Sequence, residues 1–233
     1  MDRWCSMVVF DMAGTTVRDE DNAVASAVRS ALAEFGCEIA IEDVNPVMGM
    51  PKPLAVQTLL KQFSKDASLV ARSDEVHERF QQIIVDHYRN GPDVSEIPGT
   101  SGVFRALRDA GIRVTLDTGF DRMTLDTIVE RLGWGSLLDA TVASDEVEHG
   151  RPAPDMTHVL MQKCGVTDPA QVCKIGDSVS DIEQGINAGC GLVAAVLCQR
   201  TRNEVGKHEG VVAVVSIEDL LPHLGLELAK ANG

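Results

Sequence analysis

The second half of the chain alternates between short apolar runs and amphipathic stretches, and this alternation restricts the fold more than any other feature. The apolar runs cover residues 112–116, 137–142, 172–175, 192–197 and 211–215. Between and after them, helical spacing of apolar residues covers 101–110, 121–132, 155–164, 180–188 and 217–224. Strands that alternate with helices form βαβ units with parallel strands. The pattern therefore predicts an α/β fold with a parallel sheet.

Another apolar run, residues 6–10, lies near the N-terminus and ends abruptly in Asp11-Met12-Ala13-Gly14-Thr15-Thr16. A β-branched run closed by turn-forming residues is typical of a buried strand, and we expect it to join the same sheet. The stretch between this strand and the alternating region has helical spacing and lacks strand signals. We predict a Rossmann-like core of residues 1–16 and 93–233 and an inserted helical cap of residues 17–92.

The composition narrows the classes of partner. The 233 residues carry a formal net charge of −14, and 44% of them are hydrophobic. Nucleic acids and anionic membranes bind basic surfaces, so neither is expected as a partner. The six cysteines form no CxxC pair, which fits free thiols in a reducing cytoplasm. No apolar run approaches the ~18 residues that a membrane span needs.

Polar residues follow three of the expected strands. Asp11 follows the first, Thr118-Gly119 the second, and Gly176-Asp177 the fourth, with Asp181 in the next helix. Each could be an ordinary turn or helix cap. Carboxyl ends of parallel strands meet at one edge of a sheet, where ligands bind. Together they predict one site, to which Arg151 adds a cation from a loop before a helix.

The residue types of this site suit phosphoryl chemistry. Like charges on Asp11, Asp177 and Asp181 would raise one another's pKa, and Mg²⁺ removes that problem because it favours oxygen ligands. Thr118, Arg151 and the backbone N–H groups near Gly14 and Gly119 can donate to phosphoryl oxygens. Asp11, in the tightest turn, is then expected to attack phosphorus and form an aspartyl-phosphate.

In this order the residues resemble the four motifs of the haloacid dehalogenase superfamily of aspartate-nucleophile hydrolases. They are Asp11 with Thr15, Thr118, Arg151 (commonly Lys in the family), and Gly176-Asp177 with Asp181. The resemblance covers the whole chain, including a helical cap after the first motif. It implies a small phosphorylated or phosphono-substrate and a Mg²⁺ cofactor held by Asp11, the Ala13 carbonyl and Asp177, with Asp181 as support.

The first motif departs from most phosphatases of that superfamily, which have a second acid where this chain has Ala13. That acid protonates the leaving alkoxide, and general acid catalysis is typically worth ~10²–10⁴-fold. The motifs resemble those of the phosphonoacetaldehyde hydrolase branch, which shares the change. That resemblance implies a cap-loop lysine that forms a Schiff base, found here in Met48-Gly49-Met50-Pro51-Lys52, where Gly49 would contact substrate.

Three positions differ from that branch, which has a histidine, a tyrosine and a cysteine where this chain has Ala55, Phe120 and Asp21. The leading hypothesis is cleavage of the P–C bond of phosphonoacetaldehyde or a related phosphono-aldehyde, with Asp11 and Lys52 as catalytic residues. Lys52 could instead be a solvent-exposed loop lysine. The alternatives are a phosphatase for small phosphate monoesters and a non-enzymatic phosphate-binding protein. The apolar faces of the cap helices are compatible with a homodimer.

Overall fold

The computed structural model describes residues 4–19, 22–48, 50–198 and 201–228. At its centre lies a parallel sheet with the strand order β3-β2-β1-β4-β5-β6. Its strands are β1 (Met7–Phe10), β2 (Arg113–Thr118), β3 (Ala140–Ala143), β4 (Val172–Gly176), β5 (Leu192–Val196) and β6 (Val211–Val214). The predicted α/β fold with a Rossmann-like parallel sheet is confirmed, and β1 joins the sheet at its middle.

The register of the central strands aligns their carboxyl ends. Phe10, the last residue of β1, lies opposite Leu116 of β2 and Ile175 of β4. The polar residues that follow these three strands therefore meet at one edge of the sheet. The strand order reverses direction between β1 and β4, and such a reversal opens a crevice for ligands beyond the strand ends.

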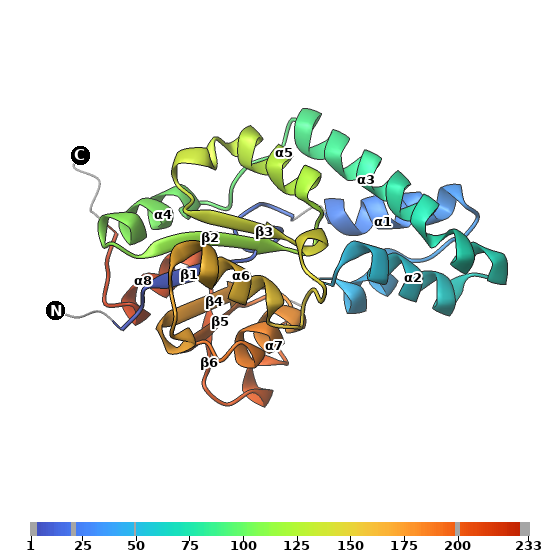
Figure 1. Cartoon of the computed structure of the whole chain (residues 1–233). Helices are drawn as coiled ribbons and strands as arrows, with labels where there is room; N and C mark the ends of the chain where they lie inside the picture. Colours follow the sequence, from blue (N-terminus) through green and yellow to red (C-terminus); the bar gives the residue numbers. More distant parts are fainter. Residues whose placement is uncertain (1–3, 20–21, 49, 199–200, 229–233) are drawn as a thin grey trace.

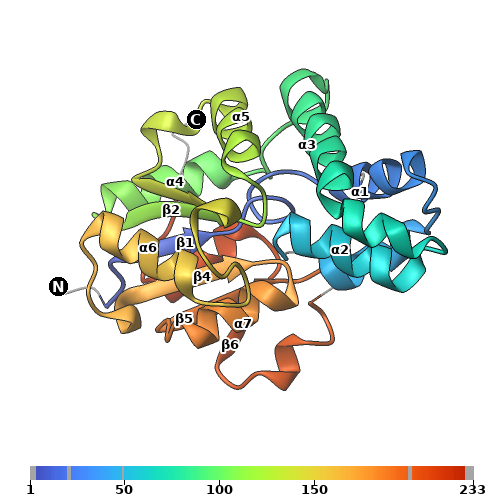
Figure 2. The same cartoon turned by 45° about the vertical axis from the view of Figure 1, so that its right-hand side comes forward.

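The alternating side chains of β1 supply the core on both faces of the sheet. Val8 and Phe10 belong to one apolar cluster, in which the rings of Phe10 and Phe104 meet edge to face at 5.1 Å. Met7 and Val9 belong to a second cluster on the other face. The helices α4 (Thr100–Asp109) and α5 (Arg122–Leu132) cover the first face, and α6 (Asp155–Cys164) and α7 (Val179–Asn187) cover the second (Figures 1 and 2).

The described residues between β1 and α4 form helices and no strand longer than an isolated bridge. They comprise α1 (Ala23–Glu34), η1 (Ile41–Val47), α2 (Lys52–Phe63), η2 (Ala67–Arg72) and α3 (Ser73–Asn90). These helices lie together on one side of the molecule, beyond the carboxyl ends of the strands (Figure 1). The C-terminal part of α3 returns beside α5 (Figure 2). This placement brings the helical segment against the edge at which the polar strand ends meet.

Some predicted boundaries were wrong. Lys52, expected in a cap loop, is instead the first residue of α2. Pro53 lies in its first turn, where a backbone N–H has no partner in the helix and proline is tolerated. The strand expected from residue 137 begins at Ala140, after the short helix η3 (Trp134–Ser136). The last expected helix divides into η7 (Ile217–Asp219) and α8 (Leu220–His223).

The remaining short helices are η4 (Ser144–Glu146), η5 (Pro169–Gln171) and η6 (Val205–Lys207). Among the described residues, the helices are all too short or too polar to cross a bilayer.

Candidate active site

Asp11 directly follows β1 and begins a tight turn. The carbonyl of Met12 accepts hydrogen bonds from the backbone N–H groups of Thr15, Thr16 and Val17, at 2.8–3.2 Å. The Thr16 hydroxyl donates to the Asp11 carbonyl at 2.9 Å. Asp11 itself is only 5% exposed. The turn thus fixes a carboxylate at the sheet edge with little freedom to move.

The Asp11 carboxyl titrates in an unusual environment. Burial raises its pKa to about 6, and the negative charge of Asp181 adds to the increase. The cations Arg151 and Lys174 act in the opposite direction. Asp11 therefore depends on nearby positive charge to remain ionised, as a nucleophilic carboxylate must.

Arg151 supplies much of that charge and is almost completely buried. One of its terminal nitrogens lies 2.8 Å from Asp11 Oδ1 and 3.7 Å from Asp117 Oδ1, and the other pairs with Asp181. These carboxylates raise the pKa of Arg151 and outweigh the effect of burial. Its Nε has no hydrogen-bond partner within the described part of the chain. The guanidinium therefore has a donor left for an anion beside Asp11.

Two buried charges of this network were not predicted as site residues. Lys174, inside β4, donates to Asp117 Oδ1 at 2.5 Å and lies 3.1 Å from Asp181 Oδ1. Burial alone would raise the pKa of Asp181, but the charges of Arg151 and Lys174 hold it below its usual value. The available signal was a charged residue inside each of two expected strands, Lys174 within the apolar run of β4 and Asp117 near the end of β2.

Lys52 is buried at the start of α2, so it is not a solvent-exposed loop lysine. Its backbone N–H donates to the Gly119 carbonyl at 3.3 Å. Its Nζ lies 5.2 Å from the centre of the Phe120 ring and makes a long 3.5 Å hydrogen bond to the Met50 carbonyl. Burial, together with the charge of Arg151, lowers the pKa of Lys52 from 10.5 to about 8. At pH 7 about a tenth of the amine is thereby neutral, which is its nucleophilic form.

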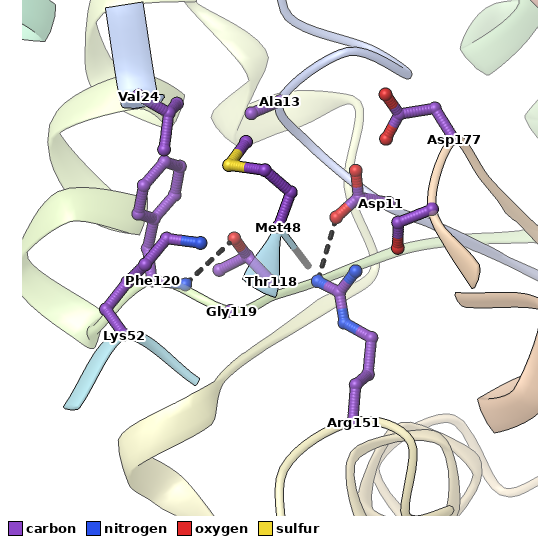
Figure 3. Close-up of a pocket in the computed structure, with 11 residues that line it drawn as sticks. Asp11, Ala13, Val24, Met48, Lys52, Thr118, Gly119, Phe120, Arg151 and Asp177 are labelled. Carbon is purple, nitrogen blue, oxygen red and sulfur yellow. Dashed lines mark hydrogen bonds and ion pairs between the residues drawn. The ribbon is translucent and has the colours of Figure 1, made fainter. Parts of the chain in front are cut away.

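Thr118 ends β2 and lies beside Lys52 (Figure 3). Its hydroxyl oxygen accepts a hydrogen bond from the Phe120 N–H at 3.2 Å, which leaves the hydroxyl proton for another acceptor. The Gly119 carbonyl also accepts from the Ser144 hydroxyl at 3.1 Å. This loop is therefore anchored from both the core and α2.

These residues surround one small pocket (Figure 3). It is lined by Asp11, Ala13, Val24, Met48, Lys52, Thr118, Gly119, Phe120, Arg151, Asp177 and Ser178. Its volume is about 20 Å³, which is room for about one water molecule. A larger ligand must widen it by moving side chains.

Oxygen donors that could hold a magnesium ion gather in two places near Asp11. The carboxylate oxygens of Asp11, Asp117 and Asp181 lie within 4.8 Å of one another, but Arg151 and Lys174 already pair with them. On the other side of Asp11, Figure 3 shows the Asp177 carboxylate pointing toward it, and Ala13 lines the same pocket. Two carboxylates and a backbone carbonyl are a donor set that fits Mg²⁺.

Not every predicted substrate contact lies in this pocket. Gly14 and Thr15 line a neighbouring cavity of about 590 Å³, which Asp177 also lines. The Gly14 N–H donates to the Val17 carbonyl at 2.8 Å and so serves the turn. The Thr15 hydroxyl is buried and lacks a hydrogen bond to any described residue. Gly49 and Asp21 lie outside the described residues.

The loop that carries Arg151 touches the start of α2. A Cβ added at Gly150 would overlap the ring of Pro51, the residue before Lys52. A proline ring cannot swing away, so glycine at this position allows the two loops to approach closely.

Comparisons with known proteins agree with this geometry. Residues 8–195 match the model of the haloacid dehalogenase-like hydrolases. The phosphonoacetaldehyde hydrolase of Bordetella pertussis is 28% identical over 198 residues, 82% of this chain and 72% of that protein. That of Bordetella avium is 31% identical over 204 residues, 82% and 71% of the two chains.

A solved structure shares the whole fold. The phosphonoacetaldehyde hydrolase-like protein from Oleispira antarctica has a TM-score of 0.79 and 20% identity, over 97% of this chain and 94% of that one. The parallel sheet, the polar residues at its edge and the family match lead to one conclusion: this chain is an enzyme that belongs to the haloacid dehalogenase-like hydrolase family.

Proposed function

We propose that this hydrolase cleaves the phosphorus–carbon bond of phosphonoacetaldehyde or a related phosphono-aldehyde. The observation that carries the proposal is that a buried Lys52 with a lowered pKa lines the same pocket as Asp11. The pocket has Ala13 where a phosphatase needs an acid for its alkoxide leaving group. A carbon leaving group stabilised through an iminium needs no such acid. The names of the two Bordetella relatives support the same substrate class.

The proposed reaction begins at Lys52. Its neutral amine attacks the aldehyde carbon, and loss of water gives a protonated imine. The Asp11 carboxylate then attacks phosphorus, and the electrons of the breaking P–C bond move into the imine to form an enamine. Water hydrolyses the aspartyl-phosphate, while protonation and hydrolysis of the enamine release the aldehyde and restore Lys52.

The other pocket residues position the phosphoryl group in this proposal. The Thr118 hydroxyl and the Arg151 guanidinium donate to its oxygens, with Gly119 beside them. Mg²⁺, held by Asp11, the Ala13 carbonyl and Asp177, would neutralise negative charge on phosphoryl oxygens when bound. Asp181 keeps Arg151 and Lys174 in place and supports the site from behind. Gly14, Thr15 and Gly49 remain proposed substrate contacts, for which the pocket must widen.

The division into parts is also proposed. Residues 1–16 and 93–233 form the catalytic core, and residues 17–92 form a cap that delivers Lys52. The hydrogen bond from Gln81 to Asp121, 3.0 Å, supports a closed arrangement, as does that from the Lys52 N–H to Gly119. A cytoplasmic location and a homodimer through the cap helices stay predictions, and light scattering of the purified protein tests the dimer.

Phosphate release and adduct trapping test the proposed function. With Mg²⁺, the protein should release phosphate from phosphonoacetaldehyde and not from a panel of small phosphate monoesters. Borohydride added with substrate should leave a reduced adduct on Lys52, identified by mass spectrometry. Lys52→Ala should lose both activities, whereas Lys61→Ala, which removes an exposed lysine from the same helix, should keep them. Release from monoesters without any adduct would establish the phosphatase instead.

A further inference from the structure

Tyr88 on α3 is a buried residue whose hydroxyl forms no hydrogen bond with the described part of the chain. It is the single tyrosine of the sequence and is 1% exposed. Its hydroxyl has no hydrogen-bond partner among residues 4–19, 22–48, 50–198 and 201–228. An unpaired buried hydroxyl costs on the order of 1–3 kcal/mol. A phenylalanine would fill the same space without that cost.

The position of Tyr88 connects it to the catalytic pocket. Its ring meets the Phe120 ring edge to face at 5.8 Å. Phe120 in turn lines the pocket and lies under the Lys52 ammonium, 5.2 Å from ring centre to Nζ. Burial raises the pKa of Tyr88 well above its usual value, and the charges of Asp19 and Asp11 add to the increase. The hydroxyl therefore keeps its proton at all working pH values, and it lies within electrostatic reach of Asp11 and Asp19.

The pocket needs to widen for any organic phosphorus compound, because its volume is about 20 Å³. Tyr88 contacts the Phe120 ring, which lines the pocket, and its hydroxyl gains a hydrogen bond if the widening of the pocket lets a ligand reach it. Val24 and Met48, which also line the pocket, have side chains that cannot donate one.

We propose that Tyr88 is a specificity-determining residue whose hydroxyl donates a hydrogen bond to an oxygen on the carbon chain of the substrate. The site then selects phosphono-compounds that carry a carbonyl or hydroxyl oxygen over those with a plain alkyl chain. In the proposed P–C cleavage this oxygen is that of the aldehyde, and the inference rests on that function for its substrate class. Tyr88 takes part in no covalent step.

A pair of ligands that differ by one hydroxyl tests the inference. Calorimetry with Mg²⁺ present should show that the wild type binds 2-hydroxyethylphosphonate about fivefold tighter than ethylphosphonate, as one neutral hydrogen bond allows. Tyr88→Phe should bind the two equally, with its affinity for ethylphosphonate unchanged. Its Tm should not fall, since the hydroxyl has no partner to lose among the described residues.

Thr157→Val is the matched control. Thr157 also has a buried hydroxyl for which the described residues offer no partner, but it lies on α6, which packs against β1, β2 and β3, whereas Tyr88 contacts the pocket residue Phe120. This variant should keep both the Tm and the fivefold preference.

Three results would overturn the inference. They are a preference retained in Tyr88→Phe, a wild type that does not distinguish or bind the two ligands, and a Tm lowered by several degrees in Tyr88→Phe. Phosphate release from phosphonoacetaldehyde by the wild type is measured separately, so the proposed function can hold where this inference fails, and the reverse.

Discussion

Lys52 is the residue that distinguishes the proposed P–C bond cleavage from the alternative, hydrolysis of phosphate monoesters. Lys52 is buried at the first position of α2, which lowers its pKa to about 8, and its side chain lines the pocket (Figure 3). Ala13, in the same pocket, stands where an ester-cleaving enzyme of this family would have a general acid. The two residues lie 39 positions apart and meet only in the folded chain.

The lowered pKa of Lys52 predicts a pH profile. Below about pH 8 the amine is mostly protonated, so the rate of adduct formation with phosphonoacetaldehyde should rise about tenfold per pH unit from pH 6 to 7. The rate should level off above about pH 9. Borohydride trapping at fixed short times measures it. A rate that keeps rising toward pH 10.5 would mean that Lys52 titrates as a free lysine.

At the scale of elements, a buried ion pair between Lys174 and Asp117 connects β4 with β2 across the strand β1, which lies between them. β2 and β4 both lie beside β1, and Lys174 of β4 reaches Asp117 of β2 and Asp181 of α7. With Asp11 and Arg151 included, the network contains three carboxylates and two cations. Removing one member leaves a buried charge uncompensated.

Lys174→Met should therefore destabilise the protein by about 3–5 kcal/mol. Urea unfolding followed by circular dichroism measures the loss. The control is Lys163→Met on α6, whose Nζ is 3.8 Å from Glu146 and 42% exposed, and which should cost less than about 1 kcal/mol. Equal losses in the two variants would contradict a structural role of the buried pair.

The sequence predicted the position of a site residue where the residues next to it along the chain form a recognisable turn or strand end. The turn at Asp11 and the strand ends at Thr118 and Asp177 have local signals, and the structure brings all three to one pocket. The link between Asp117 and Lys174 spans 57 residues and depends on strand order, which no local pattern specifies. The unsatisfied hydroxyl of Tyr88 likewise depends on how α3 packs against the core.

At the scale of the whole molecule, charge is distributed unevenly. The chain carries a net charge of −14, while the cations Lys52, Arg151 and Lys174 are buried at the site. The net negative charge therefore repels an anionic substrate at long range, and the buried cations attract it only once it has entered the site. Mobile ions screen exposed charges beyond about 8–10 Å at 0.1–0.15 M salt, and buried pairs much less.

This distribution predicts an unusual salt dependence. With Mg²⁺ held constant, kcat/KM for the anionic substrate should rise severalfold between about 20 and 200 mM KCl, because screening weakens the repulsion. The value of kcat should stay nearly constant, since the buried network is shielded from salt. Steady-state phosphate release measures both. A kcat/KM that falls with salt would indicate an attractive surface field around the entrance.

The contact of Gly150 with Pro51 has a consequence for how the two catalytic groups are coupled. Arg151 directly follows Gly150, and Lys52 directly follows Pro51. Because Gly150 has no side chain, the two loops touch there, which sets how closely Lys52 and Arg151 approach each other. A methyl group there would push the start of α2, and Lys52 with it, away from the loop of Arg151. Position 150 thus offers a way to separate the proposed imine formation from the proposed phosphoryl transfer and to study each half-reaction alone.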